Sequence, residues 1–216
     1  NFWTLHSFQI GATLDMLLFF RVLGLRARAA QIQAQEAMRE RDLMQSLANT
    51  DPLTGLSNRR GLQHALHAAL AHCSPQRLVA VYLMDLDGFK PINDAHGHDV
   101  GDDLLVAVGH RLQANVRHQT DLVARLGGDE FIIMARDLAT PEQAEDLGRS
   151  LLRAFEQPFT LSNLRIQVGL TIGYALAPLD SDDPQGLLRY ADAAMYAGKQ
   201  RGKHSLQRIP ATAALA

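Results

Sequence analysis

The chain has 216 residues, 47% hydrophobic and 20% charged, with a formal net charge of −2 at pH 7. This length and apolar content suffice for one sizeable core plus an appendage, and the balanced charge argues against a nucleic-acid-binding surface. The one cysteine, Cys73, has no partner for an internal disulfide, which fits a reducing compartment and a buried, inert thiol. Because the first residue is Asn, we expect a piece of a longer chain.

Residues 1–25 are mostly apolar and, at about 1.5 Å per helical residue, long enough to cross a hydrocarbon layer of about 30 Å. Asp15 and Arg21 interrupt this stretch, and charges inside a membrane span are costly. An amphipathic soluble helix and a shortened signal anchor are therefore alternatives. We favour the last membrane helix of a multi-helix sensor, with Trp3 at one interface and the arginines at its end on the cytoplasmic side.

Residues 26–48 contain strong helix formers and neither Gly nor Pro. Small apolar residues recur at alternating steps of three and four, which indicates a coiled-coil seam of poor quality. A weak parallel stalk suits a signalling linker, although a single solvated helix explains the pattern equally well. Pro52 then ends the helix and opens a turn-rich hinge, Asp51–Asn58, before an amphipathic helix at Arg59–Ala71.

A buried strand is predicted at Leu78–Met84, and polar residues follow it directly in the sequence Asp-Leu-Asp-Gly-Phe-Lys. Ligands bind at the carboxyl ends of strands in open α/β sheets, and a lysine there suits a phosphate. The alternative is a plain strand-end turn with capping aspartates. Next we expect a short helical turn at Pro91–Asp94, a glycine-broken loop at His96–Asp103 and a helix at Leu104–Val116.

The segment Leu122–Arg136 predicts a hairpin, because two apolar runs meet at Gly127 and Gly128 and adjacent glycines allow the positive φ of a two-residue turn. The turn presents Asp129 and Glu130, two hard-oxygen groups of the kind that Mg²⁺ prefers. An ordinary hairpin with a solvated acidic tip is the alternative.

The C-terminal third predicts a helix capped by Thr140, two strands around a Ser-Asn turn and a last helix. Cations near the end of that helix either complement its dipole or neutralise a triphosphate. The fold class is therefore α/β, a mixed central sheet flanked by helices in the order β-α-α-β-β-α-β after the first helix. The ranges of these elements are Pro141–Phe155, Phe159–Leu161, Leu164–Ala175 and Pro184–Lys199.

Four segments resemble, in order and separation, the motifs of the GGDEF-domain family of diguanylate cyclases. They are DPLTGLSNRRGL (Asp51–Leu62), DLDGFKPIND (Asp85–Asp94), RLGGDEF (Arg125–Phe131) and YADAAMYAGKQRGK (Tyr190–Lys203). The resemblance implies a GGDEF domain over residues 49–208, related to nucleotidyl cyclases and polymerase palms, with a tail at 209–216. It implies an enzyme that condenses two GTP into cyclic di-GMP and two pyrophosphates, working as a homodimer of antiparallel domains under an upstream sensor.

By the same resemblance, Mg²⁺ (or Mn²⁺) is held by Asp85, the carbonyl of Leu86 and Asp129, with Glu130 for a second ion. Asp129 is also the expected proton acceptor for the attacking 3′-hydroxyl. Lys90 stabilises the developing charge.

The resemblance assigns the substrate contacts to further residues. Asn93 and Asp102 read the guanine base, with His98 lining the nucleotide, since an amide and a carboxylate match guanine but not adenine. The expected phosphate contacts are Lys90, the N–H groups of Gly88 and Phe89, and Lys199 and Lys203, with Arg125 touching product or phosphate. Lys203 stands where the family uses Arg, which removes the bidentate fork.

The resemblance also implies a product-inhibition site made of an Arg and an Asp, and in this chain we expect that site to be degenerate. Asp121 keeps its place, but His118 stands at the arginine position, and Arg117 is one residue out of register and would point elsewhere by about 100° on a helix end. We therefore expect weak or no feedback inhibition. A catalytically silent module that binds GTP or a partner is the main alternative; a cyclase making another cyclic dinucleotide is a third, which Asp102 argues against. The expected location is the inner (cytoplasmic) membrane, with the catalytic domain in the cytoplasm.

Overall fold

The computed structural model describes residues 48–210 continuously, together with isolated helical residues between Met16 and Met38. The chain divides into two compact units, Asn1–Ser46 and Leu47–Ala216. Most of the apolar N-terminal stretch and of the coiled-coil seam, and the last six residues of the expected tail, lie outside the described residues. Among the residues that are described, no helix has the length and apolar character needed to cross a membrane.

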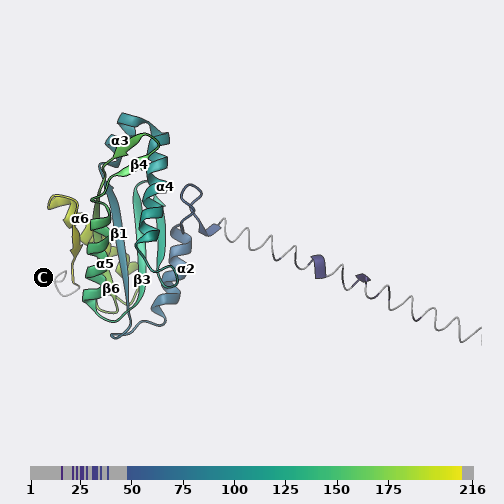
Figure 1. Ribbon diagram of the computed structural model, residues 1–216. Coiled ribbons are helices and arrows are strands. Elements are labelled where there is room, and N and C mark those ends of the chain that lie inside the picture. The colour runs from purple at the N-terminus through teal and green to yellow at the C-terminus, as the bar shows by residue number, and fades with distance from the viewer. Residues whose placement is uncertain are drawn as a thin grey trace, which may run out of the picture. The chain divides into compact units, whose positions relative to one another are not determined.

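The second unit is built on a five-stranded sheet with the order β2-β3-β1-β6-β7. Its central strand, β1 (Leu78–Asp87), pairs antiparallel with both neighbours, and the short edge strand β7 pairs parallel with β6. The sheet is therefore mixed, as the sequence predicted, and helices lie along both of its faces (Figure 1). The other strands are β2 (Leu122–Gly127), β3 (Glu130–Leu138), β6 (Gly169–Ala177) and β7 (Leu206–Arg208).

Two apolar layers form because successive side chains of a strand point to opposite faces. Even-numbered residues of β1 join the core beneath α4 (His98–Ala114) and α5 (Pro141–Ala154), whereas odd-numbered ones join the core beneath α2 (Arg59–Leu70) and α6 (Pro184–Gln200). The same alternation continues beyond the core. It places the carboxylates that end β1 on the face covered by α6.

The region after β1 differs from the predicted turn and loop. Helix α3 (Phe89–His96) and α4 are continuous helices separated only by Gly97, whose φ of 89° breaks the helix. Gly101 lies inside α4 rather than in a loop. The Asn93 side chain packs so closely on it that a Cβ at Gly101 would lie 1.7 Å from Asn93 Oδ1, so glycine is the residue that fits. Packing between the two helices thus overrides the low helix propensity of glycine.

Other elements also differ from prediction. The predicted strand at residues 164–175 splits into β5 (Leu164–Ile166), which pairs with β4 (Phe159–Leu161), and the separate β6. Strand β7 was not predicted at all. Thr140 occupies the first position before α5, but its side chain makes no capping hydrogen bond.

Candidate active site

A cavity of about 300 Å³ opens at the carboxyl end of β1. It collects residues from three separate parts of the chain: the end of β1 with the start of α3, the β2–β3 turn, and the end of α6. Eight of the predicted site residues line it. They are Asp85, Leu86, Gly88, Phe89, Lys90, Asp129, Lys199 and Lys203, joined by Asp87 and Pro91, to which the sequence analysis gave no role.

The turn after β1 brings main chain to the cavity. Gly88 precedes α3 in the left-handed conformation, with φ of 87° and ψ of 17°, and no side chain caps this helix start. A residue with a Cβ is strained in that conformation, so glycine is the residue that fits. The first N–H groups of α3 therefore receive no hydrogen bond from a capping side chain. They lie next to the cavity that Lys90 lines.

The acidic hairpin reaches the same cavity from β2 and β3. Gly127 and Gly128 both have positive φ, 140° and 53°, as predicted. Gly127 pairs with Glu130, however, so the two-residue turn is Gly128–Asp129, one residue later than predicted. Glu130 lies opposite Asp85 in the β1–β3 register, which directs both side chains to the α6 face.

The carboxylate of Asp85 is held in an ion pair. Lys199 Nζ lies 2.6 Å from Asp85 Oδ2, with the two side chains 35% and 14% exposed. Burial raises the pKa of Asp85 above its ordinary value, and the nearby Asp129 adds to this rise, whereas the hydrogen bond and charge of Lys199 lower it. The site thus places carboxylates close together and already recruits one cation to them.

The carboxylate and carbonyl oxygens at this end of the cavity suit a hard divalent cation, because Mg²⁺ prefers such oxygen ligands. Within the described part of the chain, no set of three His, Cys, Asp or Glu side chains is arranged to hold a metal ion. Asp85, Asp129 and Glu130, to which the sequence analysis assigned two metal ions, therefore do not form a site of three carboxylates; the predicted set of Asp85, the Leu86 carbonyl and Asp129 stays a prediction. In this arrangement one of the carboxylates, Asp85, is paired with the ammonium group of Lys199.

The predicted base-reading residues lie outside the lining of this cavity, on α3 and α4. The Oδ1 atom of Asn93 is buried and has no hydrogen-bond partner among the described residues. Such an orphaned acceptor is costly unless a ligand or water supplies a donor. His98 and Asp102 are exposed and four residues apart on α4, hence on one side of that helix.

Arg125 connects the hairpin to the hinge. Its Nε and Nη2 donate to the carbonyl of Gly128 at 3.0 and 2.8 Å, and its Nη1 lies 3.1 Å from Asp51 Oδ1. These contacts use the guanidinium group of Arg125 to stabilise the turn that carries Asp129. Its predicted contact with product or phosphate stays a prediction.

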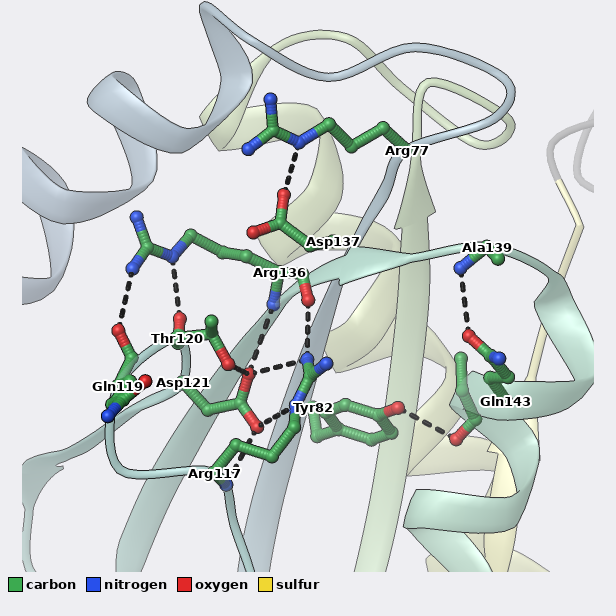
Figure 2. A network of polar contacts seen from close by, with 11 residues as sticks. Arg77, Tyr82, Arg117, Gln119, Thr120, Asp121, Arg136, Asp137, Ala139 and Gln143 are labelled. Carbon is green, nitrogen blue, oxygen red and sulfur yellow. Dashed lines mark hydrogen bonds and ion pairs between the residues drawn. The ribbon is translucent and has the colours of Figure 1, made fainter.

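The residues of the expected product-inhibition site lie apart from the active-site cavity. Arg117 binds Asp121 through Nε and Nη2, at 3.1 and 2.8 Å (Figure 2). The expectation that Arg117 points elsewhere is therefore wrong: α4 already ends at Ala114, so helical geometry does not apply to Arg117. Asp121 also accepts from Thr120 and from the Arg136 N–H, and its side chain is 1% exposed.

Comparisons with known proteins agree with this geometry. A family model described as diguanylate cyclase, GGDEF domain, matches residues 48–205. The bifunctional diguanylate cyclase/cyclic di-GMP phosphodiesterase MucR of Pseudomonas aeruginosa is 41% identical over 181 residues, covering 83% of this chain but only 26% of MucR. The chain thus spans about a quarter of the length of that relative.

Two solved structures share the fold. The GGDEF domain of TpbB (YfiN) from P. aeruginosa gives a TM-score of 0.66 at 38% identity, covering 71% of this chain and 96% of that one. The coiled coil and GGDEF domain of DgcB from Caulobacter crescentus, in complex with c-di-GMP, gives 0.71 at 25% identity, covering 85% and 98%. The fold, the motifs and the family match together place this chain in the GGDEF-domain family of diguanylate cyclases.

Proposed function

We propose that this domain is a diguanylate cyclase, which condenses two GTP into cyclic di-GMP and releases two pyrophosphates. One observation carries the proposal: a single cavity unites the carboxylates Asp85 and Asp129 with the ammonium groups of Lys90, Lys199 and Lys203. Phosphoryl transfer depends on positioning and on charge stabilisation, and these are the groups that supply both.

The triphosphate would lie against the three lysines and the uncapped N–H groups at the start of α3, since both kinds of donor favour anions. Asp85, Asp129 and the carbonyl of Leu86 would hold Mg²⁺, with Glu130 for a second ion. When bound, Mg²⁺ neutralises charge on the attacking and leaving oxygens. Lys199 would then leave Asp85 for the phosphates.

The guanine base would lie against α3 and α4. Asn93 lies on α3, and its side-chain amide carries both a donor and an acceptor, which match the O6 acceptor and the N–H donors of guanine. Asp102 and His98, on one side of α4, would line the same ligand. Adenine offers a different donor pattern, so these residues favour GTP.

In the reaction, the 3′-oxygen of one GTP forms a bond to the α-phosphorus of the other, and the bond from that phosphorus to pyrophosphate breaks. The 3′-hydroxyl proton passes to Asp129, and Lys90 stabilises the charge that develops on the phosphate. Because each domain would bind one GTP, two domains must face each other in antiparallel orientation. Dimerisation is then part of catalysis, and the helix at residues 26–48 is its natural point of control.

Asp129→Asn and Glu130→Gln test the carboxylate roles. Each variant should lose cyclic di-GMP formation from Mg²⁺ and GTP, measured by chromatography with mass detection. Each should also keep the thermal unfolding midpoint of the original protein, since neither side chain belongs to the buried core. Unchanged turnover in both variants would contradict the roles assigned to these two carboxylates.

A silent module that binds GTP and regulates a neighbouring domain is the second candidate. It is favoured by the pairing of Lys199 with Asp85, because this ammonium group competes with a divalent cation for the carboxylate. The relative MucR joins cyclase and phosphodiesterase functions in one chain of which this sequence covers 26%, so a regulatory role beside another domain fits the family. GTP binding that is lost in Asp102→Ala, without any product from the original protein, would select this candidate.

Attachment to the inner membrane through residues 1–25 is part of the proposal, based on the apolar sequence of that stretch. Cell fractionation tests it. Recovery of the chain in the membrane pellet, released by detergent but not by carbonate, is expected; recovery in the supernatant would contradict it.

A further inference from the structure

The second carboxylate at the end of β1, Asp87, lines the candidate cavity but is engaged by the protein itself. Both of its oxygens lie 2.9 Å from the hydroxyl of Thr171, which is fully buried. Its Oδ2 also accepts the backbone N–H of His204 at 2.9 Å. Asp87 therefore joins three segments: the end of β1, strand β6 and the segment after α6.

The strand opposite Asp87 leaves space for this carboxylate. Gly169 is its partner in the β1–β6 register, and a Cβ at Gly169 would lie 3.1 Å from both Cβ and Oδ2 of Asp87. A side chain there would compete for the space of the carboxylate. The glycine thus keeps Asp87 in place to meet Thr171 and His204.

The segment that Asp87 holds has an unfavourable backbone. Lys203 and His204 have φ of 63° and 41°, in the left-handed region that side-chain-bearing residues seldom occupy. Contacts on either side maintain this conformation: the Lys203 N–H donates to Gly198 O at 3.3 Å, and the Leu170 N–H to His204 Nδ1 at 3.4 Å. The hydrogen bond from His204 to the Asp87 carboxylate is the shortest of the three and involves a charged acceptor, which makes it the strongest.

Lys203, which this backbone carries, lines the cavity together with Lys90 and Lys199. We infer that Asp87 is a positioning residue for phosphate binding: through His204 it fixes the strained segment that aims Lys203 into the cavity. It is thus not a metal ligand, although it lies two residues after Asp85 on the same face of β1. The inference rests on the proposed function, because it takes the ligand of Lys203 to be the triphosphate of a nucleotide.

Asp87→Ala and Asp87→Asn separate positioning from metal binding. Alanine removes the acceptor for His204, so we expect affinity for inorganic tripolyphosphate with Mg²⁺, measured by calorimetry, to fall about fivefold, the loss expected when one lysine no longer reaches the phosphates. Asparagine still accepts from the His204 N–H through Oδ1 while its amide donates to the Thr171 hydroxyl, so it should keep affinity within about twofold. A metal ligand would not be rescued in this way, because an amide is a much poorer ligand than a carboxylate.

Two further measurements complete the test. The double variant Asp87→Ala/Lys203→Met should bind tripolyphosphate no more weakly than Lys203→Met alone, since both changes act through one ammonium group. Binding of Mn²⁺ alone, followed by electron paramagnetic resonance, should be unchanged in Asp87→Asn and weakened in Asp85→Asn. If Asp87→Ala fails to fold, Thr171→Val replaces it as the test. This variant should bind tripolyphosphate about threefold more weakly, and Thr171→Ser, which keeps the hydroxyl, should bind it as tightly as the original protein.

Several outcomes would overturn the inference. They are unchanged tripolyphosphate affinity in Asp87→Ala, additive losses in the double variant, and a loss of Mn²⁺ binding in Asp87→Asn equal to that in Asp85→Asn. Each leaves the cyclase proposal standing. Failure of the unaltered protein to bind tripolyphosphate would overturn the proposed function and this inference together.

Discussion

Replacing Lys199 tests whether this lysine competes with the metal ion for Asp85 and also binds the phosphates. The ammonium group lies 2.6 Å from Asp85 Oδ2, and both side chains keep some contact with solvent, at 35% and 14% exposure. A partly exposed pair of this kind stabilises by about 1 kcal/mol, which corresponds to about fivefold in an equilibrium constant. A divalent cation that binds Asp85 must overcome that pairing and the repulsion of the ammonium group.

Lys199→Met should therefore change two affinities in opposite directions. Without nucleotide, Mn²⁺ should bind about fivefold more tightly, because Asp85 has lost its competing cation. Tripolyphosphate, by contrast, should bind about fivefold more weakly, because the cavity has lost one of its lysines. Paramagnetic resonance of free Mn²⁺ and calorimetry measure the two quantities.

The experiment needs a pH at which Asp85 is ionised in both proteins. Burial raises the pKa of Asp85 and Lys199 partly lowers it, so the variant has the higher pKa of the two. We would work near pH 8, far above the ordinary range of an aspartate. Lys203→Met is the matched control: in the described part of the chain Lys203 forms no ion pair, so this variant should weaken tripolyphosphate and leave Mn²⁺ unchanged. Equal or weaker Mn²⁺ binding in Lys199→Met would refute the reasoning.

Three other variants probe the base site, the core and the hinge. Gly101→Ala should displace Asn93, since the new Cβ would lie 1.7 Å from its Oδ1; affinity for GTP should fall while that for tripolyphosphate stays, by calorimetry. Arg111→Met should cost about 2–4 kcal/mol in urea unfolding, because Arg111 donates to the last carbonyl of α5 and to two carbonyls between α5 and β4, and its Cζ lies 3.4 Å from the Phe159 ring centre. For Asp51, burial raises the pKa but hydrogen bonds from Thr54 and Arg125 outweigh it, leaving a net lowered pKa. Its stabilising contribution is thus present above pH 3.8 and lost as the pH falls below, so urea unfolding of Asp51→Asn should differ from the original protein at pH 7, and the difference should shrink as the pH falls below 3.8.

Local patterns were enough to predict the core of this fold. The apolar run of β1 and the glycine pair at Gly127–Gly128 each identify an element through rules that act within a few residues. The same patterns pointed to the carboxylates that the structure gathers at one cavity. These features are predictable because a strand alternation or a positive φ is encoded where it occurs.

The features that were missed depend on contacts between distant segments. Strand β7 has three residues, too few for a periodic signal, and exists through its pairing with β6. Asp87 has a visible signal, since it follows Asp85 at the spacing that shares a strand face, but its partners Thr171 and His204 lie far along the chain. No sequence window contains both sides of these contacts.

Product analysis tests the central claim most directly. The purified protein is incubated with Mg²⁺ and GTP over a range of protein concentrations, and the nucleotides are separated and identified by mass. The account predicts cyclic di-GMP and pyrophosphate, with a rate per molecule that rises with protein concentration until the dimer is saturated. Absence of cyclic di-GMP at every concentration, from a folded protein that still binds GTP, would contradict it.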